Sequence, residues 1–331
     1  MPRPFFIVGA PRTGTTLLRR VLVAHPAIAI PPESFFIAEY LEAEHVPLER
    51  RLALWLKDPE LLEWGEPFAT DDFTDCPDMA AIVRRTHELF AERRGAEIWG
   101  QKTPRLVRSW ERLATLYPDA VFIHPTRDPR AVVSSLQRSP AHQLNPLMGA
   151  RRWRDDTAMG LAMEEHLGER VFRYDYEALA RDPEGIARRV CDHLDLPFDP
   201  VMLAKPTEKL ELKASEERAG HHTETARPIH AESVERWRDD LSDEERAVVA
   251  HVTHEVARRA GYELPDVAPP SAGTRFRMTA RHGWTSVRKA LRDVSTTPEI
   301  LELARRHAAL GSLRRMIGEA FASGRSRRPI G

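Results

Sequence analysis

The segment Gly9-Ala-Pro-Arg-Thr-Gly-Thr-Thr16 has the residue types and the spacing of a phosphate-binding loop. An apolar run precedes it and residues with helical spacing follow it, so its backbone N–H groups would surround an anion at a helix N-terminus. Arg12 adds a positive charge, and Thr13, Thr15 and Thr16 add hydroxyl donors. Thr15 replaces the lysine that reaches the β- and γ-phosphates of nucleoside triphosphates. The loop therefore predicts an anionic ligand without favouring a triphosphate.

A second element that could hold a phosphate follows the apolar run 120–124. Arg127 lies just past this expected strand, and Ser135 comes eight residues later. Ligands of open α/β sheets bind beyond the carboxyl ends of strands, where a guanidinium and a hydroxyl could hold a second phosphate. The strand ends in His124-Pro-Thr, without the carboxylate that binds Mg²⁺ in P-loop NTPases, and no four-ligand zinc spacing occurs. We therefore expect no metal.

Strand–turn–helix units recur along the chain and would position these residues. Strands are expected at Pro4–Gly9, Ala96–Gly100, Ala120–His124 and Arg170–Tyr174. Helices are expected at Thr15–Ala24, Leu106–Leu116, Pro129–Leu136, Met148–Leu167, Tyr176–Ala180, Pro183–Leu194, Glu232–Arg238 and Asp243–Ala260, with a mainly helical insertion at Pro32–Arg94. Such units predict a parallel sheet with helices on both faces. The expected fold is α/β and P-loop-like, with three layers, a central parallel sheet, the helical insertion and a C-terminal helical arm.

The charge of the chain is balanced overall but divided unevenly. The 331 residues include 49 Lys and Arg against 50 Asp and Glu, which excludes nucleic-acid binding through bulk positive charge. Residues 271–331 carry a net charge of +9, which leaves −10 on residues 1–270. A Pro-rich stretch marks the boundary. We expect a catalytic domain at 1–265 and a basic extension at 266–331, with a helix at Pro298–Ala322 that could mediate a homo-oligomer.

Two further observations concern the cellular environment. The two cysteines, Cys76 and Cys191, are too few for a disulfide framework. The N-terminal apolar run is too short for a secretory signal, and no run approaches the length of a membrane span. The expectation is a cytoplasmic protein without stable membrane insertion.

Both motifs, in their order and spacing, resemble those of sulfotransferases that use 3′-phosphoadenosine 5′-phosphosulfate (PAPS). The segment GAPRTGTTLLRRVLVAHP is similar to the 5′-phosphosulfate loop, and VFIHPTRDPRAVVSS is similar to the 3′-phosphate motif. The resemblance covers roughly residues 5–262 and is strongest to tyrosylprotein sulfotransferases and their bacterial relatives. It implies PAPS as the donor, with Arg12, Thr13, Gly14, Thr15 and Thr16 at the phosphosulfate. It also implies Arg127 and Ser135 at the 3′-phosphate.

The resemblance implies further contacts with the nucleotide. Tyr176 matches a tyrosine of the family that lies at the nucleotide, with an interior tyrosine as the alternative. Arg227, followed by proline, matches a basic-Pro step upstream of a tryptophan that closes over the nucleotide, here Trp237. Ser215 matches a serine upstream of that step.

The resemblance also implies two catalytic residues. Glu33 falls where tyrosylprotein enzymes have a catalytic glutamate, and a carboxylate there could accept the acceptor's proton. The alternative for Glu33 is an N-cap or first-turn acid that is stabilised by a helix dipole. Lys102 matches a lysine near the bridging oxygen, where a cation neutralises the leaving phosphate; the alternative is a solvated turn residue. Phe35 replaces an arginine that supports the protein-tyrosine reaction, which favours a more apolar acceptor.

The function expected from the sequence is sulfuryl transfer from PAPS to a hydroxyl or an amine, with Glu33 as the general base. A small molecule, a carbohydrate or a lipid would be the acceptor. Two alternatives stay open: a P-loop nucleotide kinase or NTPase, and a non-catalytic nucleotide-binding module. The missing loop lysine and the missing metal-binding acid argue against the first.

Overall fold

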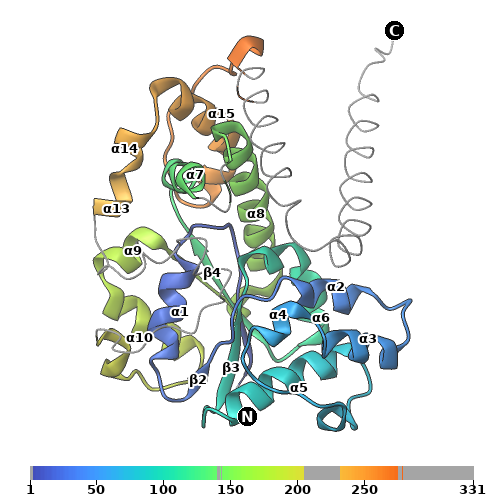
Figure 1. Cartoon of the computed structure of the whole chain (residues 1–331). Helices are drawn as coiled ribbons and strands as arrows, with labels where there is room; N and C mark the ends of the chain where they lie inside the picture. The colour runs from blue at the N-terminus through green and yellow to red at the C-terminus, as the bar shows by residue number, and fades with distance from the viewer. Residues whose placement is uncertain (1–2, 140–141, 143, 205–231, 275–277, 279–331) are drawn as a thin grey trace. The chain divides into compact units, whose positions relative to one another are not determined.

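A five-stranded parallel sheet lies between layers of helices (Figure 1). The computed structural model describes residues 3–139, 142, 144–204, 232–274 and 278. The strands are β1 Phe5–Ile7, β2 Ile28–Ala29, β3 Ile98–Lys102, β4 Val121–Thr126 and β5 Val171–Asp175, in the order β2-β3-β1-β4-β5. The predicted α/β fold with a parallel sheet is confirmed. Strand β2 was not predicted, because two residues are too few to form a pattern.

Alternating side chains of the strands point to two hydrophobic layers. Phe5 and Ile7 pack with α1 (Thr15–Val23) and α10 (Pro183–His193), whereas Phe6 packs with the helices of the opposite face. Figure 1 shows α1, α10 and α9 (Tyr176–Arg181) on one side of the strands. Because both faces are covered, the ligand site has to lie at an end of the sheet.

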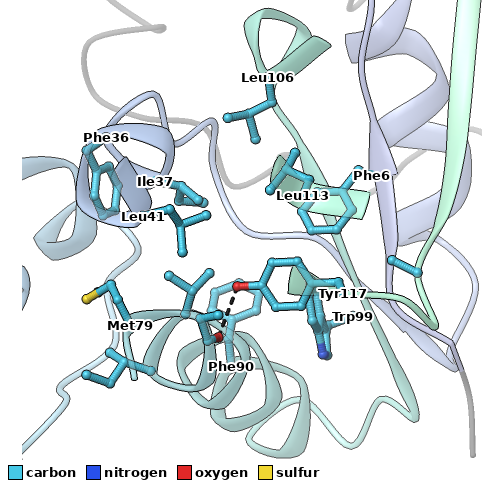
Figure 2. Close-up of a cluster of buried hydrophobic side chains, with 14 of the residues drawn as sticks. Phe6, Phe36, Ile37, Leu41, Met79, Phe90, Trp99, Leu106, Leu113 and Tyr117 are labelled. Carbon is cyan, nitrogen blue, oxygen red and sulfur yellow. Dashed lines mark hydrogen bonds between the residues drawn. The ribbon is translucent and has the colours of Figure 1, made fainter. Parts of the chain in front are cut away.

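The insertion between β2 and β3 covers the second face. Its helices are α2 Phe36–Glu42, α3 Leu48–Trp55, α4 Pro59–Leu62 and α5 Met79–Glu92, with a 3₁₀ turn at Thr70–Phe73. Figure 2 shows how residues of this insertion pack against Phe6, Trp99 and Tyr117. The Tyr117 hydroxyl donates a hydrogen bond of 3.0 Å to the carbonyl of Ala80, which satisfies the buried phenol. The insertion is thus anchored to the sheet.

The remaining helices lie between β3 and β5 or follow β5 in the chain. They are α6 Trp110–Leu116, α7 Pro129–Arg138, α8 Pro146–Leu167, α13 Glu232–Glu235, α14 Trp237–Asp240 and α15 Asp243–Arg259, with 3₁₀ turns at Pro104–Ser109, Gly168–Arg170 and Pro200–Leu203. The predicted helix at 106–116 is wrong in its first part, because a 3₁₀ turn that begins with Pro104 occupies it. The predicted helix at 232–238 is divided at Arg236, the N-cap of α14. Helices α7, α8 and α15 pack around Trp153.

The region around the predicted domain boundary is described only in part. Past residue 265, the Thr274 hydroxyl donates to Glu244 Oε1 at 2.7 Å, and the Met278 carbonyl accepts a 2.8 Å hydrogen bond from Asn145. The predicted helix at 298–322 lies outside the described residues, so the division at 265 stays a prediction. Among the described residues, no helix is both long enough and apolar enough to cross a membrane.

Candidate active site

The phosphate-binding loop connects β1, the central strand, to α1. Arg12 and Gly14 have left-handed backbone conformations, with φ angles of 67° and 86°. The Thr13 hydroxyl between them is buried and donates to the Ala10 carbonyl at 2.8 Å, which closes the turn. A non-glycine residue such as Arg12 pays about 1–3 kcal/mol for this backbone, so the surrounding structure must enforce it. Such turns at a helix N-terminus form concave anion sites.

Residues that follow β4 and β5 hold the loop. A Cβ atom on Gly14 would lie 2.4 Å from Cδ2 of Tyr176, so only glycine fits beneath this ring. The Arg127 guanidinium stacks on the same ring, 4.0 Å from its centroid, and donates to the Arg12 carbonyl at 3.1 Å. Trp153 Nε1 donates to the Arg127 carbonyl at 2.9 Å. The predicted nucleotide-binding residues of three strands therefore lie together at the carboxyl edge.

The two predicted phosphate sites are adjacent. Arg12 Nε donates to the Ser135 hydroxyl at 3.0 Å, which joins the loop to α7. Burial lowers the pKa of Arg127, while the nearby Glu177 opposes that shift. Burial also raises the pKa of Glu177, whose oxygens accept hydrogen bonds of 3.1 Å from a backbone N–H and from the Tyr262 hydroxyl. The arrangement holds a buried guanidinium where an anion can approach.

Lys102 and Glu33 form an ion pair beside the loop. Lys102 ends β3, and its side chain is only 1% exposed. Its Nζ also lies 3.4 Å from the Thr16 hydroxyl, at the last position of the loop motif. The alternative of a solvated turn lysine is therefore wrong. Glu33 lies before α2, whose N-cap is Phe35, and its ionic partner is Lys102, so it is neither the N-cap nor a first-turn acid of that helix.

The segment that carries Glu33 is fixed by a buried hydrogen-bond network. The Ser34 N–H donates to Thr103 Oγ1 at 2.9 Å, and the same hydroxyl accepts from Gln101 Nε2 at 2.7 Å. Trp64 Nε1 donates to the Ser34 hydroxyl at 3.1 Å. These supporting residues were not predicted, because partners about 30 and 70 positions apart leave no local pattern. The network would hold the carboxylate in place without substrate.

Of the three remaining residues that were predicted near the nucleotide, the structure describes only Trp237. Ser215 and Arg227 lie outside the described residues, so both assignments stay predictions. Trp237 is only 5% exposed and packs into a hydrophobic cluster with α7, α8 and α15, with the Arg130 guanidinium 4.0 Å from its ring. Trp237 is therefore a core residue in this structure, rather than a residue that closes over the loop.

A cavity of about 690 Å³ lies at the outer edge of β5. Its walls come from the end of β4, β5, α9, α10, α13 and the residues that follow α15, including Glu177 and Tyr262. None of the loop residues, Glu33 or Lys102 lines it. It therefore borders the nucleotide side of the site and is separate from the Lys102–Glu33 pair. Within the described ranges, no cluster of three or more His, Cys, Asp or Glu side chains could hold a metal ion.

Comparisons with known proteins agree on one family. Residues 4–200 match the model of the sulfotransferase family. Protein-tyrosine sulfotransferase A of Caenorhabditis elegans is 26% identical over 84% of this chain and 72% of that protein. The nodulation protein NoeE of Sinorhizobium fredii is 27% identical over 80% of this chain and 67% of that protein. A solved sulfotransferase domain of the Synechococcus olefin synthase has the same fold, with a TM-score of 0.58 and 24% identity over 80% of this chain and 96% of that domain.

Proposed function

We propose, on the premise that the chain belongs to the sulfotransferase family, that it moves a sulfuryl group from PAPS to a hydroxyl or an amine of an acceptor. The observation that carries this proposal is the position of Lys102. Its Nζ contacts both the Thr16 hydroxyl of the phosphate-binding loop and the Glu33 carboxylate. A single buried cation thus joins the group that would hold the leaving phosphate to the group that would take the proton.

The loop and the adjacent basic residues support PAPS as the donor. PAPS carries two anionic ends, and the chain offers two neighbouring anion sites. The loop N–H groups, Arg12 and the threonine hydroxyls would hold the 5′-phosphosulfate. Arg127 and Ser135 would hold the 3′-phosphate, and the 3.0 Å contact between Ser135 and Arg12 supports one ligand that spans both sites. Tyr176, which covers Gly14, would contact the same nucleotide.

The transfer itself would use Glu33 and Lys102. Glu33 accepts the proton of the acceptor hydroxyl while its oxygen forms a bond to sulfur. The bond between sulfur and the bridging oxygen breaks, and Lys102 and the loop amides stabilise the charge that develops on the phosphate. General base catalysis of this kind contributes about 10²–10⁴-fold to the rate. The transferred group is a monoanion, and this set of fixed cations and N–H dipoles would carry the electrostatic role.

The surroundings of Glu33 support an acceptor with an apolar part. Phe35, two residues beyond Glu33, is 42% exposed, so an apolar side chain is open to a ligand close to the Lys102–Glu33 pair. Its N–H donates to Glu60 at 3.0 Å, which fixes this segment against α4. Although the C. elegans relative is named for protein tyrosine, Phe35 favours a small-molecule, carbohydrate or lipid hydroxyl for this chain.

A nucleotide-binding experiment tests the proposed donor. Isothermal titration should show that the protein binds 3′-phosphoadenosine 5′-phosphate (PAP) more tightly than ATP, with or without Mg²⁺. The Arg127→Gln variant should weaken PAP binding by roughly tenfold or more, because a charge-assisted contact of about 1.5–3 kcal/mol is lost. Tighter binding of ATP with Mg²⁺ than of PAP would refute PAPS as the donor and favour an NTPase or kinase.

A further inference from the structure

A histidine of β4 lies against the start of the phosphate-binding loop. His124 is fully buried, and its Nδ1 lies 2.5 Å from Glu164 Oε1 of α8. Its Nε2 is also buried and has no hydrogen-bond partner in the described part of the chain. A neutral imidazole carries one proton, which the contact with the Glu164 carboxylate places on Nδ1. Nε2 is therefore the atom that can take a second proton.

Two glycines from different elements make room for this imidazole. A Cβ atom on Gly9, the first residue of the loop motif, would lie 3.0 Å from His124 Cδ2 and 3.4 Å from Nε2. A Cβ atom on Gly160 of α8 would lie 2.2 Å from both Cε1 and Nε2. The Gly9 N–H donates to the Pro104 carbonyl at 3.0 Å, which fixes the backbone beside the ring. The unpartnered nitrogen thus lies between the loop and α8, out of contact with solvent.

The charged groups around the ring form a short chain. Glu164 is partly exposed, and its second oxygen lies 3.5 Å from Arg173 Nη1 of β5. Asp156, another acid of α8, is buried and paired with Arg108 of the 3₁₀ turn before α6. Glu164 is thus the acid that balances the ring. The chain of Arg173, Glu164 and His124 is neutral when Nε2 is unprotonated and carries one positive charge when Nε2 is protonated.

A positive charge at this position would assist an anion-binding loop. The loop has Thr15 in place of the lysine of P-loop NTPases, and residues 1–270 carry a net charge of −10. Two unit charges about 10 Å apart, roughly the span from Gly9 to Arg12, change a binding constant by about tenfold at an effective dielectric constant of about 20. Histidine changes its charge between about pH 5 and 8. Anion binding in the loop and protonation of His124 therefore favour each other.

We propose that His124 is a positioning residue whose protonation tightens the binding of the donor's anionic group to the loop. The imidazole supports the loop at Gly9, and the imidazolium adds a charge that Thr15 does not supply. Glu164 holds the ring in place and favours its protonated form. This inference rests on the proposed donor and names the proton as a regulator of the same site. The affinity for the donor should rise as the pH falls from 8 to 6.

Inorganic sulfate is the probe that isolates this effect, because its charge is constant between pH 6 and 8. Sulfate binding is measured by calorimetry at constant ionic strength. Wild type should bind sulfate about fivefold more tightly at pH 6 than at pH 8. The Kd of His124→Asn should differ by less than about twofold between the two pH values, because asparagine can still donate to Glu164 but does not take up a proton.

Two further variants separate the charge from the packing. Glu164→Gln keeps the imidazole between the glycines but removes the carboxylate that favours the imidazolium, so the dependence on pH should disappear. His193→Asn is the matched control, because His193 ends α10 near Arg3, which precedes β1, at the sheet edge opposite the loop. This control should respond to pH as wild type does. Equal sulfate affinity of wild type at both pH values, or a dependence that His124→Asn or Glu164→Gln retains, would overturn the proposal.

Titration with PAP connects the effect to the donor. A phosphate monoester itself titrates near about pH 6, so wild type and His124→Asn are compared at each pH. The ratio of the variant's Kd to that of wild type should be about fivefold larger at pH 6 than at pH 8. The same ratio at both pH values would also count against the proposal. If wild type binds no PAP at either pH, the proposed function fails, while the sulfate titration still decides the role of His124.

Discussion

Replacing Gly14 by alanine would test how tightly the loop and the Tyr176 ring fit together. The new Cβ would lie 2.4 Å from Tyr176 Cδ2, whereas carbon atoms in contact are normally about 3.5–4.0 Å apart. The ring must therefore move by about 1 Å, away from the position in which Arg127 stacks on it at 4.0 Å. The perturbation acts on both predicted phosphate sites through one ring.

Two contributions to the free energy of unfolding can be separated. Alanine at the φ of 86° found for Gly14 costs about 1–2 kcal/mol in backbone strain. The overlap with Tyr176 adds about 1–3 kcal/mol, as for other overpacked sites. Gly65 is the matched control, because its φ is 74° and a Cβ there would meet nothing within 4 Å. Backbone strain alone should therefore lower the free energy of unfolding of Gly65→Ala.

Urea unfolding and PAP titration measure both effects. Gly14→Ala should be less stable than Gly65→Ala by about 1–3 kcal/mol, and only Gly14→Ala should bind PAP more weakly, by about tenfold or more. If the two variants have equal stability and bind PAP as wild type does, the close contact between the loop and Tyr176 is refuted.

Three further changes give expected outcomes. Lys102→Met should lower kcat about 10²–10³-fold, because the charge that neutralises the leaving phosphate is lost; unchanged initial rates would contradict this role. Ser135→Ala removes the partner of Arg12 Nε and should raise the Kd of PAP about 2–10-fold in a calorimetric titration. An unchanged Kd would contradict a role of Ser135 in PAP binding. Burial lowers the pKa of His87, so the unfolded chain binds more protons below about pH 6.5 and stability is lost as the pH falls. The midpoints of urea unfolding at pH 7 and pH 5.5 should differ more for wild type than for His87→Gln. Equal differences for the two proteins would argue against a lowered pKa of His87.

The sequence predicted the sheet and the loop because both depend on local patterns. Short apolar runs are visible in any window of ten residues, and they located four of the five strands. Strand β2 was missed because its two residues, Ile28 and Ala29, resemble any short apolar segment. The 3₁₀ turn before α6 was missed because Leu106 and Val107 precede Trp110 of α6 by four and three residues, which is also the spacing of a helix.

The site could be predicted only where its residues belong to motifs. Lys102 and Arg127 lie at strand ends and Arg12 lies in the loop after β1, so the topology alone brings them to one edge. The network of Ser34, Thr103 and Trp64 depends on contacts between the insertion and β3, which no periodicity encodes.

The most direct test of the central claim is the turnover of Glu33→Gln. Glutamine keeps the size of the side chain but cannot take the acceptor's proton. With labelled PAPS and an acceptor that wild type sulfates, kcat should fall about 10²–10⁴-fold. The Kd of PAP should stay within about threefold of wild type, since Glu33 is expected to act on the acceptor. A variant that turns over as fast as wild type would contradict Glu33 as the general base.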